Sequence, residues 1–236
     1  MTESIVLGEI TIEVTRKAVK NVHLSVHPPD GRVTLVTPRE TRFEAARAYA
    51  IDKLGWIRDQ QQKLRNQPRE TPRQYVEGES HYLWGRRYLL SVEEREAKPE
   101  VRLDHKRIHL SVRPGAGRDK RVEVIHAWHR SLLHEAIPPL IEKWERKLSV
   151  EVSRYFLQRM KTMWGGCNPR ARTIRLNTEL IKKPKDLLEY IIVHEMAHLI
   201  EPTHNERFIA VLNKYYPTWR EARDELNQLP LSAEKR

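Results

Sequence analysis

Alternating apolar and polar residues predict strands in two separate parts of the chain. Near the N-terminus the apolar residues recur at every second position over three segments, residues 10–14, 22–26 and 33–36. The same alternation returns between residues 75 and 112, around residues 82–84, 88–92, 101–103 and 108–112. Alternation with period two is typical of strands that bury one face. The first half of the chain is therefore expected to be rich in β-structure.

Apolar positions with a period near 3.6 predict three long helical segments, residues 41–66, 119–147 and 185–200. Pro138 and Pro139 are expected to break or kink the second helix, because proline removes a backbone donor and clashes with the preceding turn. Three short strands are expected between the second and third helices, near residues 152–156, 161–164 and 173–177. The order of these elements predicts an α+β fold.

A Pro-Gly-Ala-Gly segment at residues 114–117 is the strongest candidate for a domain boundary. It predicts a β-rich N-terminal region with one helix over residues 1–115 and a second domain over residues 116–236. No internal repeat is evident in the sequence.

Composition excludes several classes of protein. The longest uninterrupted apolar run in the 236 residues, Phe208 to Leu212, is too short to cross a bilayer, and the N-terminus lacks the pattern of a signal peptide. A single cysteine, Cys167, excludes an internal disulfide framework and any zinc site built on several cysteines. We therefore expect a protein of the reducing cytoplasm without a membrane partner.

The third predicted helix contains a metal-binding pattern, His194-Glu195-Met-Ala-His198. Two histidines four residues apart project from one face of a helix, so their imidazoles can bind one zinc ion. Glu195 lies beside this pair, where its carboxylate can reach a metal-bound water without ligating the metal. Burial of two histidines and a glutamate in so apolar a helix would be costly without a metal partner.

A catalytic zinc site needs a third protein ligand and one position left for water. His204 is the preferred candidate, because Glu201-Pro202 lets the chain turn back after the helix. Glu201 and Glu206 are the alternatives for this ligand. We expect one Zn²⁺ ion, with another divalent metal as the alternative.

A second group of histidines, His126, His129 and His134, lies on the helix expected over residues 119–147. His134-Glu135 begins the same pattern, but Pro138 stands where the second histidine would be, and proline cannot ligate a metal. We interpret these three as surface or core-edge histidines.

Positive charge is concentrated just before the metal-binding pattern. Residues 154–185 contain nine basic residues and one acid, a net charge of +8. This run is either a solvated basic face or a patch for a polyanion such as nucleic acid, in which case the contacts would be sequence-independent. The candidates for nucleic-acid binding are Arg170, Arg172, Arg175, Lys182 and Lys183.

Several segments of the sequence match a known family pattern, namely Lys161–Cys167, Ile174–Asn177, Val193–Leu199, His204 and Phe208, with further matches at Asp30-Gly31, Trp56-Ile57 and Gly85–Tyr88. By these residues the chain resembles the YgjP-like metallopeptidases, which look like relatives of the SprT/Spartan DNA–protein crosslink proteases. The matching segments cover nearly the whole chain.

The resemblance implies a zincin-like minimal metallopeptidase core, with a short antiparallel sheet and an active-site helix, after a β-rich N-terminal region. It also implies that Met163, Trp164, Gly165 and Gly166 lie along the substrate cleft, beside an edge strand. The family usually has Arg at position 163 and Ser at position 166, so substrate choice is left open.

These observations predict a zinc-dependent metallopeptidase that hydrolyses peptide bonds with a Glu195-activated, metal-bound water, on peptides or on DNA-associated proteins. One alternative is a metal-dependent hydrolase of a nucleoside triphosphate or another small anion, although the sequence has no phosphate-binding glycine loop. The other alternative is a non-catalytic nucleic-acid-binding module with a structural metal. The oligomeric state is not predicted.

Overall fold

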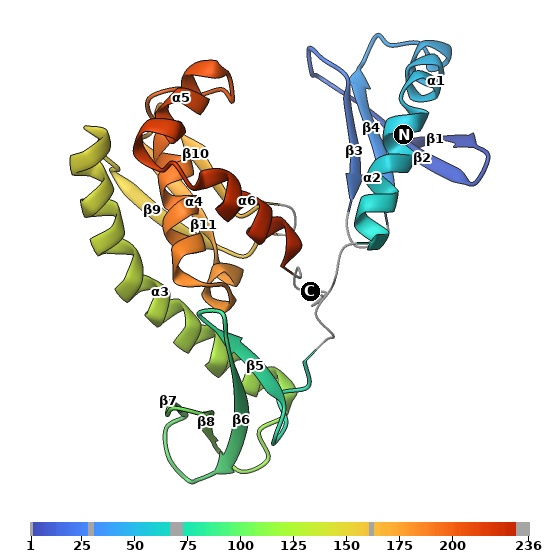
Figure 1. Ribbon diagram of the computed structural model, residues 1–236. Helices are drawn as coiled ribbons and strands as arrows, with labels where there is room; N and C mark the ends of the chain where they lie inside the picture. The colour runs from blue at the N-terminus through green and yellow to red at the C-terminus, as the bar shows by residue number, and fades with distance from the viewer. Residues whose placement is uncertain (1, 28–30, 67–72, 161–162, 230–236) are drawn as a thin grey trace. The chain divides into compact units, whose positions relative to one another are not determined.

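The alternating segments near the N-terminus form a four-stranded sheet in the order β1-β2-β4-β3 (Figure 1). In this computed structural model, which describes residues 2–27, 31–66, 73–160 and 163–229, the strands are β1 (Thr2–Leu7), β2 (Ile10–Lys17), β3 (His23–His27) and β4 (Arg32–Pro38). The buried residues of β2 and β4 alternate with partly or fully exposed ones and pack against two helices, α1 (Phe43–Asp52) and α2 (Leu54–Asn66). The single helix expected over residues 41–66 is therefore two helices that meet at Lys53, and β1 was not predicted.

The second alternating stretch forms another four-stranded sheet, in the order β5-β6-β8-β7. Its strands are β5 (Ser80–Leu83), β6 (Arg86–Glu94), β7 (Glu100–Leu103) and β8 (Arg107–Val112), all four near the predicted positions. Both four-stranded sheets have antiparallel outer pairs and one parallel central pair, and a helix follows each. The two sheets therefore share one topology, although the sequence shows no internal repeat. Strand pairing depends on the pattern of apolar positions, and different residues can produce the same pattern.

Helix α3 (Arg118–Leu148) continues through Pro138 and Pro139 as one element (Figure 1). Of the two expected outcomes, the break is therefore wrong, and the kink stays a prediction. Buried residues lie on both sides of the prolines, Leu133 and Ile137 before them and Ile141 and Trp144 after them. Packing of this apolar face holds the two halves in one helix and offsets the lost backbone hydrogen bonds.

The third sheet has three strands in the order β10-β11-β9. They are β9 (Arg154–Gln158), β10 (Gly165–Asn168) and β11 (Thr173–Asn177). The strand expected at residues 161–164 is found four residues later, and residues 161–162 lie outside the described residues. The expected antiparallel sheet is also wrong, since β11 pairs antiparallel with β10 but parallel with β9. After β9 the chain forms β10 at the opposite edge of the sheet. It then returns by a hairpin to form the middle strand β11, which therefore runs parallel to β9.

The helices after this sheet include the helix of the metal-binding pattern, which packs against β10 and β11. They are the short helix η1 (Thr178–Lys182), α4 (Lys185–Ala197), α5 (Glu206–Tyr215) and α6 (Trp219–Gln228). Most residues of α4 are buried, from Leu187 to Ala197, and they pack in one core with residues of α3, β11 and α6. A helix buried nearly all round is held in place by several elements at once.

The turn between β5 and β6 contacts the start of α4. The backbone N–H of Trp84 donates to the carbonyl of Ile181 at 2.8 Å, and Leu83 is buried in the same core as α4. Gly85 has a φ of +76°, and a Cβ atom there would lie 2.8 Å from Cγ of Pro184. The second sheet thus supports the N-terminal end of the helix that carries the histidines.

Clustering of contacts divides the chain into two compact units, Met1–Arg69 and Glu70–Arg236. The second four-stranded sheet is grouped with the C-terminal helices. The domain boundary expected after residue 115 lies within the second unit and stays a prediction. None of the helices in the described part of the chain is both long and apolar enough to cross a membrane.

Candidate metal centre

Three histidines from two different segments converge at the end of α4. His194 lies in the last turn of the helix, and His198 is its C-cap residue, with helical φ and ψ values of −67° and −15°. His204 lies in the loop before α5, and its Nε2 is 3.1 Å from Nε2 of His194. One ring nitrogen from each histidine lies within 4.8 Å of the other two. The arrangement could hold a metal ion, and neither Glu201 nor Glu206 belongs to this group.

The orientations of the rings are held by neighbouring groups. Nδ1 of His198 lies 3.1 Å from the carbonyl oxygen of Glu201, so an Nδ1–H donor leaves Nε2 free to act as a ligand. The ring of Phe208, which is buried, lies 4.5–5.0 Å from all three imidazole rings, measured between centroids. Asn205 fixes the start of α5 by accepting a hydrogen bond from the N–H of Phe208.

Burial disfavours the charged forms of His194, Glu195 and His198. Desolvation, with help from the other two imidazoles, lowers the pKa of His194 to about 4. Desolvation also lowers the pKa of His198 and raises the pKa of Glu195 to about 8. Neutral imidazoles are the form in which histidine ligates a metal.

The residues present fit a divalent metal of the zinc type. Three imidazoles are a known ligand set for catalytic zinc. The Nε2 atoms of His194 and His204 face each other at hydrogen-bond distance, so both can act as acceptors only if a proton or a cation lies between them. A cation beside Glu195 would also compensate the buried carboxylate.

Glu195 is 5% exposed and lies against the backbone of β10. A Cβ atom at Gly165 would lie 2.7 Å from Cγ and 2.8 Å from Cδ of Glu195. Any side chain at position 165 would therefore displace the carboxylate. The close approach of strand and helix depends on glycine at this position.

The four predicted cleft residues lie differently with respect to Glu195. Gly165 faces the carboxylate, whereas a Cβ atom at Gly166 would have no neighbour within 4 Å. Met163 is 58% exposed, and Trp164 is half-buried against the core with the Lys183 ammonium 5.6 Å from its ring. Of the two glycines, Gly165 is the one whose Cβ position lies against the proposed catalytic residue.

The predicted nucleic-acid-binding residues also separate into two groups. Arg170, Arg172 and Arg175 are exposed, and Arg172 forms an ion pair with Glu151 at 3.0 Å. Lys183 is 4% exposed, and Lys182 forms a 2.8 Å ion pair with the buried Glu179. These two lysines are poorly placed to contact a phosphate backbone.

The three histidines of α3 do not converge. His134 is exposed and bonds the hydroxyl of Tyr155, while His126 lies near the hydroxyl of Tyr75. His129 is 5% exposed, so its expected place at the surface or core edge is wrong. Its position follows from the spacing of Ile125, His129 and Leu133, which places it on the buried face of the helix.

Two further residues bear on the site. Tyr190, which sequence reasoning missed, lies one helical turn before His194, and their ring centroids are 5.9 Å apart. Tyr190 is four residues before His194, and this spacing could have predicted that the two side chains are neighbours on one face of the helix. Cys167 is half-buried, and burial together with Glu195 raises its pKa to about 11, so a thiolate nucleophile is disfavoured.

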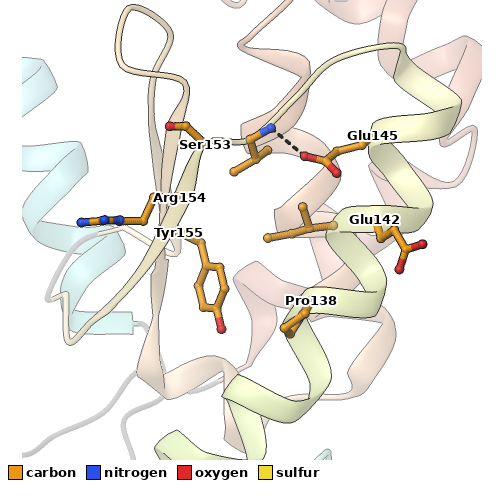
Figure 2. Close-up of a pocket in the computed structure, with 8 residues that line it drawn as sticks. Pro138, Glu142, Glu145, Ser153, Arg154 and Tyr155 are labelled. Carbon is orange, nitrogen blue, oxygen red and sulfur yellow. Dashed lines mark hydrogen bonds between the residues drawn. The ribbon is translucent and has the colours of Figure 1, made fainter.

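A pocket of about 480 Å³ lies between α3 and β9 and contains none of the predicted site residues (Figure 2). Its lining includes Pro138, Glu142, Glu145 and Tyr155. Glu145 accepts a hydrogen bond from the backbone N–H of Val152 at 2.7 Å, which ties the strand to the helix.

In a comparison with protein families, the YgjP-like metallopeptidase domain matches residues 20–229. No curated protein matches the chain. Among solved structures, the zymogen of abylysin from Pyrococcus abyssi is similar with a TM-score of 0.35 and 22% identity, over 37% of this chain and 89% of that one. The zymogen of jannalysin from Methanocaldococcus jannaschii has the same TM-score and identity, over 39% and 88% of the two chains. The family assignment rests on the domain match.

Proposed function

The chain belongs to the YgjP-like metallopeptidase family, and from that premise we propose that it hydrolyses peptide bonds with zinc held by His194, His198 and His204 and with Glu195 as general base. The observation that carries this proposal is the contact of Glu195 with the backbone of β10, beside three converging imidazoles. The contact brings a buried carboxylate, a metal-binding group and an edge strand together in one place.

The protein groups have distinct roles in the proposed reaction. Zinc, when bound, polarises the scissile carbonyl and lowers the pKa of water towards about 7. Glu195 accepts the proton of the attacking water at a carboxylate oxygen and then donates it to the leaving amine. Burial favours this transfer, because it raises the proton affinity of the carboxylate and excludes competing solvent. The hydrogen bond from His198 to the carbonyl of Glu201 keeps the imidazole in the ligating orientation.

Strand β10 is the proposed platform for the substrate. It lies at the edge of its sheet, so one side of it is not paired with another described strand. An extended peptide aligned along this edge by backbone hydrogen bonds would pass beside Gly165 and Glu195. Because β10 offers no side chain at positions 165 and 166, selection of the peptide would depend on flanking residues such as the exposed Met163.

The finer proposal on the substrate is a protein associated with DNA in a reducing cytoplasm. The exposed Arg170, Arg172 and Arg175 support it, since sequence-independent phosphate contacts of this type position a protein on DNA. The test compares degradation of one substrate protein free and attached to DNA, at low and high salt. Equal rates for the two forms at both salt concentrations would contradict this finer proposal and leave the peptidase proposal intact.

The peptidase proposal is tested with Glu195→Gln on zinc-loaded protein. Casein cleavage should fall by about 10²–10⁴, the range that a general base contributes. Zinc content should stay unchanged, because Glu195 is not a proposed ligand. A different outcome would favour the small-anion hydrolase. In that case the wild type would not cleave casein but would release pyrophosphate from nucleoside triphosphates, and Glu195→Gln would abolish this release.

A further inference from the structure

The sheet of β9, β10 and β11 has one face turned away from the catalytic helix. In its central row, Gly166 pairs with Arg175, and Arg175 pairs with Phe156. Directly opposed residues of neighbouring strands place their side chains on the same face. Arg154 is two residues before Phe156 and therefore shares this face. We call this surface, defined by Arg154, Phe156 and Arg175, the outer sheet face.

The residues between these positions point the other way. Leu157, Ile174 and Leu176 are buried in the core that contains α4, and Gly165 faces Glu195. Figure 2 shows the same alternation in β9, where Tyr155 points toward α3 and Arg154 points away from it. The outer sheet face and the candidate metal centre thus lie on opposite sides of one sheet.

The outer sheet face combines an exposed aromatic ring with guanidinium groups. Phe156 is 43% exposed, and the guanidinium carbon of Arg154 lies 6.0 Å from the centroid of its ring. Arg175, directly across from Phe156, is exposed as well. The three strands contain no acidic residue, and the nearby Glu151 is paired with Arg172. The face is therefore apolar at its centre and positively charged around it.

We propose that the outer sheet face binds an unpaired nucleic-acid strand, with a base stacked on Phe156 and the phosphates on either side held by Arg154 and Arg175. Exposed aromatic rings on a flat, basic sheet are the feature with which proteins bind single strands without sequence preference. A duplex keeps its bases stacked on one another, so it cannot use the ring. An acidic peptide would match the charge but would not need the aromatic ring.

This inference does not rest on the peptidase proposal. Arg175 was already a candidate for nucleic-acid binding in the sequence analysis. Arg154 and Phe156 are new candidates, because the concentration of positive charge alone does not distinguish them. The inference also places the strand on the side of the sheet opposite to Glu195, so that a bound strand and a bound peptide would not compete for space.

Fluorescence anisotropy with the full chain tests the stacking contact, with labelled oligo-dT and oligo-rU of about 15 nucleotides and a DNA duplex of equal length. The single strands should bind more tightly than the duplex, and the two oligonucleotides distinguish DNA from RNA. Phe156→Ala and Phe156→Leu should each weaken binding about tenfold, and Phe156→Tyr should retain it. Tyr82→Ala, which removes an exposed aromatic residue from another sheet, is the matched control. Melting temperatures measured for all variants report the fold.

The salt dependence tests the phosphate contacts. Arg154→Ala and Arg175→Ala should each reduce the slope of log K against log salt by about 0.7, whereas Arg102→Ala, an exposed arginine of β7, should leave it unchanged. The proposal is overturned if the full chain binds no single strand, if the duplex binds equally well, or if Phe156→Leu binds like the wild type. A competition experiment adds poly-glutamate at the same total negative charge as the bound oligo-dT. Displacement of the oligo-dT would overturn the proposal and favour an acidic protein partner.

Discussion

Helices α3 and α4 both contain a His-Glu pair, but among the described residues only the pair in α4 contributes to a group that could hold a metal. In α4, His194 and His198 are followed by a loop that brings His204 back to within hydrogen-bond distance of His194. In α3, His134 is followed by Pro138 at the corresponding position, and its ring bonds the hydroxyl of Tyr155. His129, on the buried face of the same helix, has an Nε2 atom without a hydrogen-bond partner among the described residues.

The difference between the two helices shows that a His-Glu pair is not enough to bring three histidines together. The pair in α4 has a ring-orienting carbonyl from Glu201, an aromatic ring, Phe208, against all three imidazoles, and a third imidazole from a separate segment. Each of these comes from residues after the helix. The predictions below test the comparison from the largest expected effect to the smallest.

The largest effect is expected from removing the third imidazole. His204→Ala should lower zinc affinity by more than the ~10–100-fold that loss of an outer-shell partner costs, because the substitution removes a proposed direct ligand. Competition with a chromophoric chelator measures the affinity. His134→Ala, which removes an exposed histidine of α3, is the control and should leave zinc binding unchanged. Equal zinc affinity of His204→Ala and wild type would show that another group is the third ligand.

The contact between β10 and Glu195 gives the next largest effect. Gly165→Ala should reduce casein cleavage about 100-fold, because the added Cβ atom displaces the Glu195 carboxylate by a distance of the order of 1 Å. Gly166→Ala, the neighbouring change on the opposite face, meets no atom within 4 Å and should retain activity. The comparison uses initial rates on zinc-loaded protein. Similar rates for the two variants would remove the special role of Gly165.

The buried histidine of α3 predicts a pH dependence of stability. Desolvation, with repulsion from Lys182, His126 and His81, holds the pKa of His129 well below its usual value, so the folded state keeps this imidazole neutral. Below about pH 6.5 the unfolded state binds the extra proton, and the free energy of unfolding therefore falls as the pH falls.

Urea unfolding at pH 7.5 and pH 5 measures this effect, with His129→Leu as the comparison. Between pH 7.5 and pH 5 the free energy of unfolding should fall by about 2 kcal/mol more in the wild type than in the variant, since leucine has no proton to bind. Other histidines contribute equally to both proteins. An identical loss in wild type and variant would show that His129 is protonated in the folded state.

The smallest effect is expected from completing the pattern in α3. Pro138→His gives this helix two histidines four residues apart around Glu135, yet zinc binding should stay at least about 100-fold weaker than at the α4 site, because no third imidazole converges there. The measurement uses Pro138→His combined with His194→Ala, so that only the α3 site is titrated. Zinc binding by this variant as tight as that of wild type would show that a helical pair alone makes the site.

Local spacing explains which elements could be predicted from the sequence. Apart from β1, the strands of both four-stranded sheets were predicted, as was the helix of the metal-binding pattern, because alternation and the 3.6-residue period depend only on neighbouring positions. The break expected at Pro138 was wrong, because packing of Ile137 and Ile141 in the core overrides the local effect of proline. The repeated sheet topology was not predicted, since pairing joins residues far apart in the chain.

The sequence by itself determined the chemistry that is available: two histidines on one helical face, a glutamate between them, a third histidine after a turn, and a basic segment before them. Only the tertiary structure decided how these groups are used. It brings His204 to His194 and Gly165 to Glu195, withdraws Lys183 from the surface, and turns Arg175 away from the metal centre. The physical reason is that helix geometry specifies directions over one or two turns, whereas loop paths, sheet register and burial depend on the packing of the whole chain.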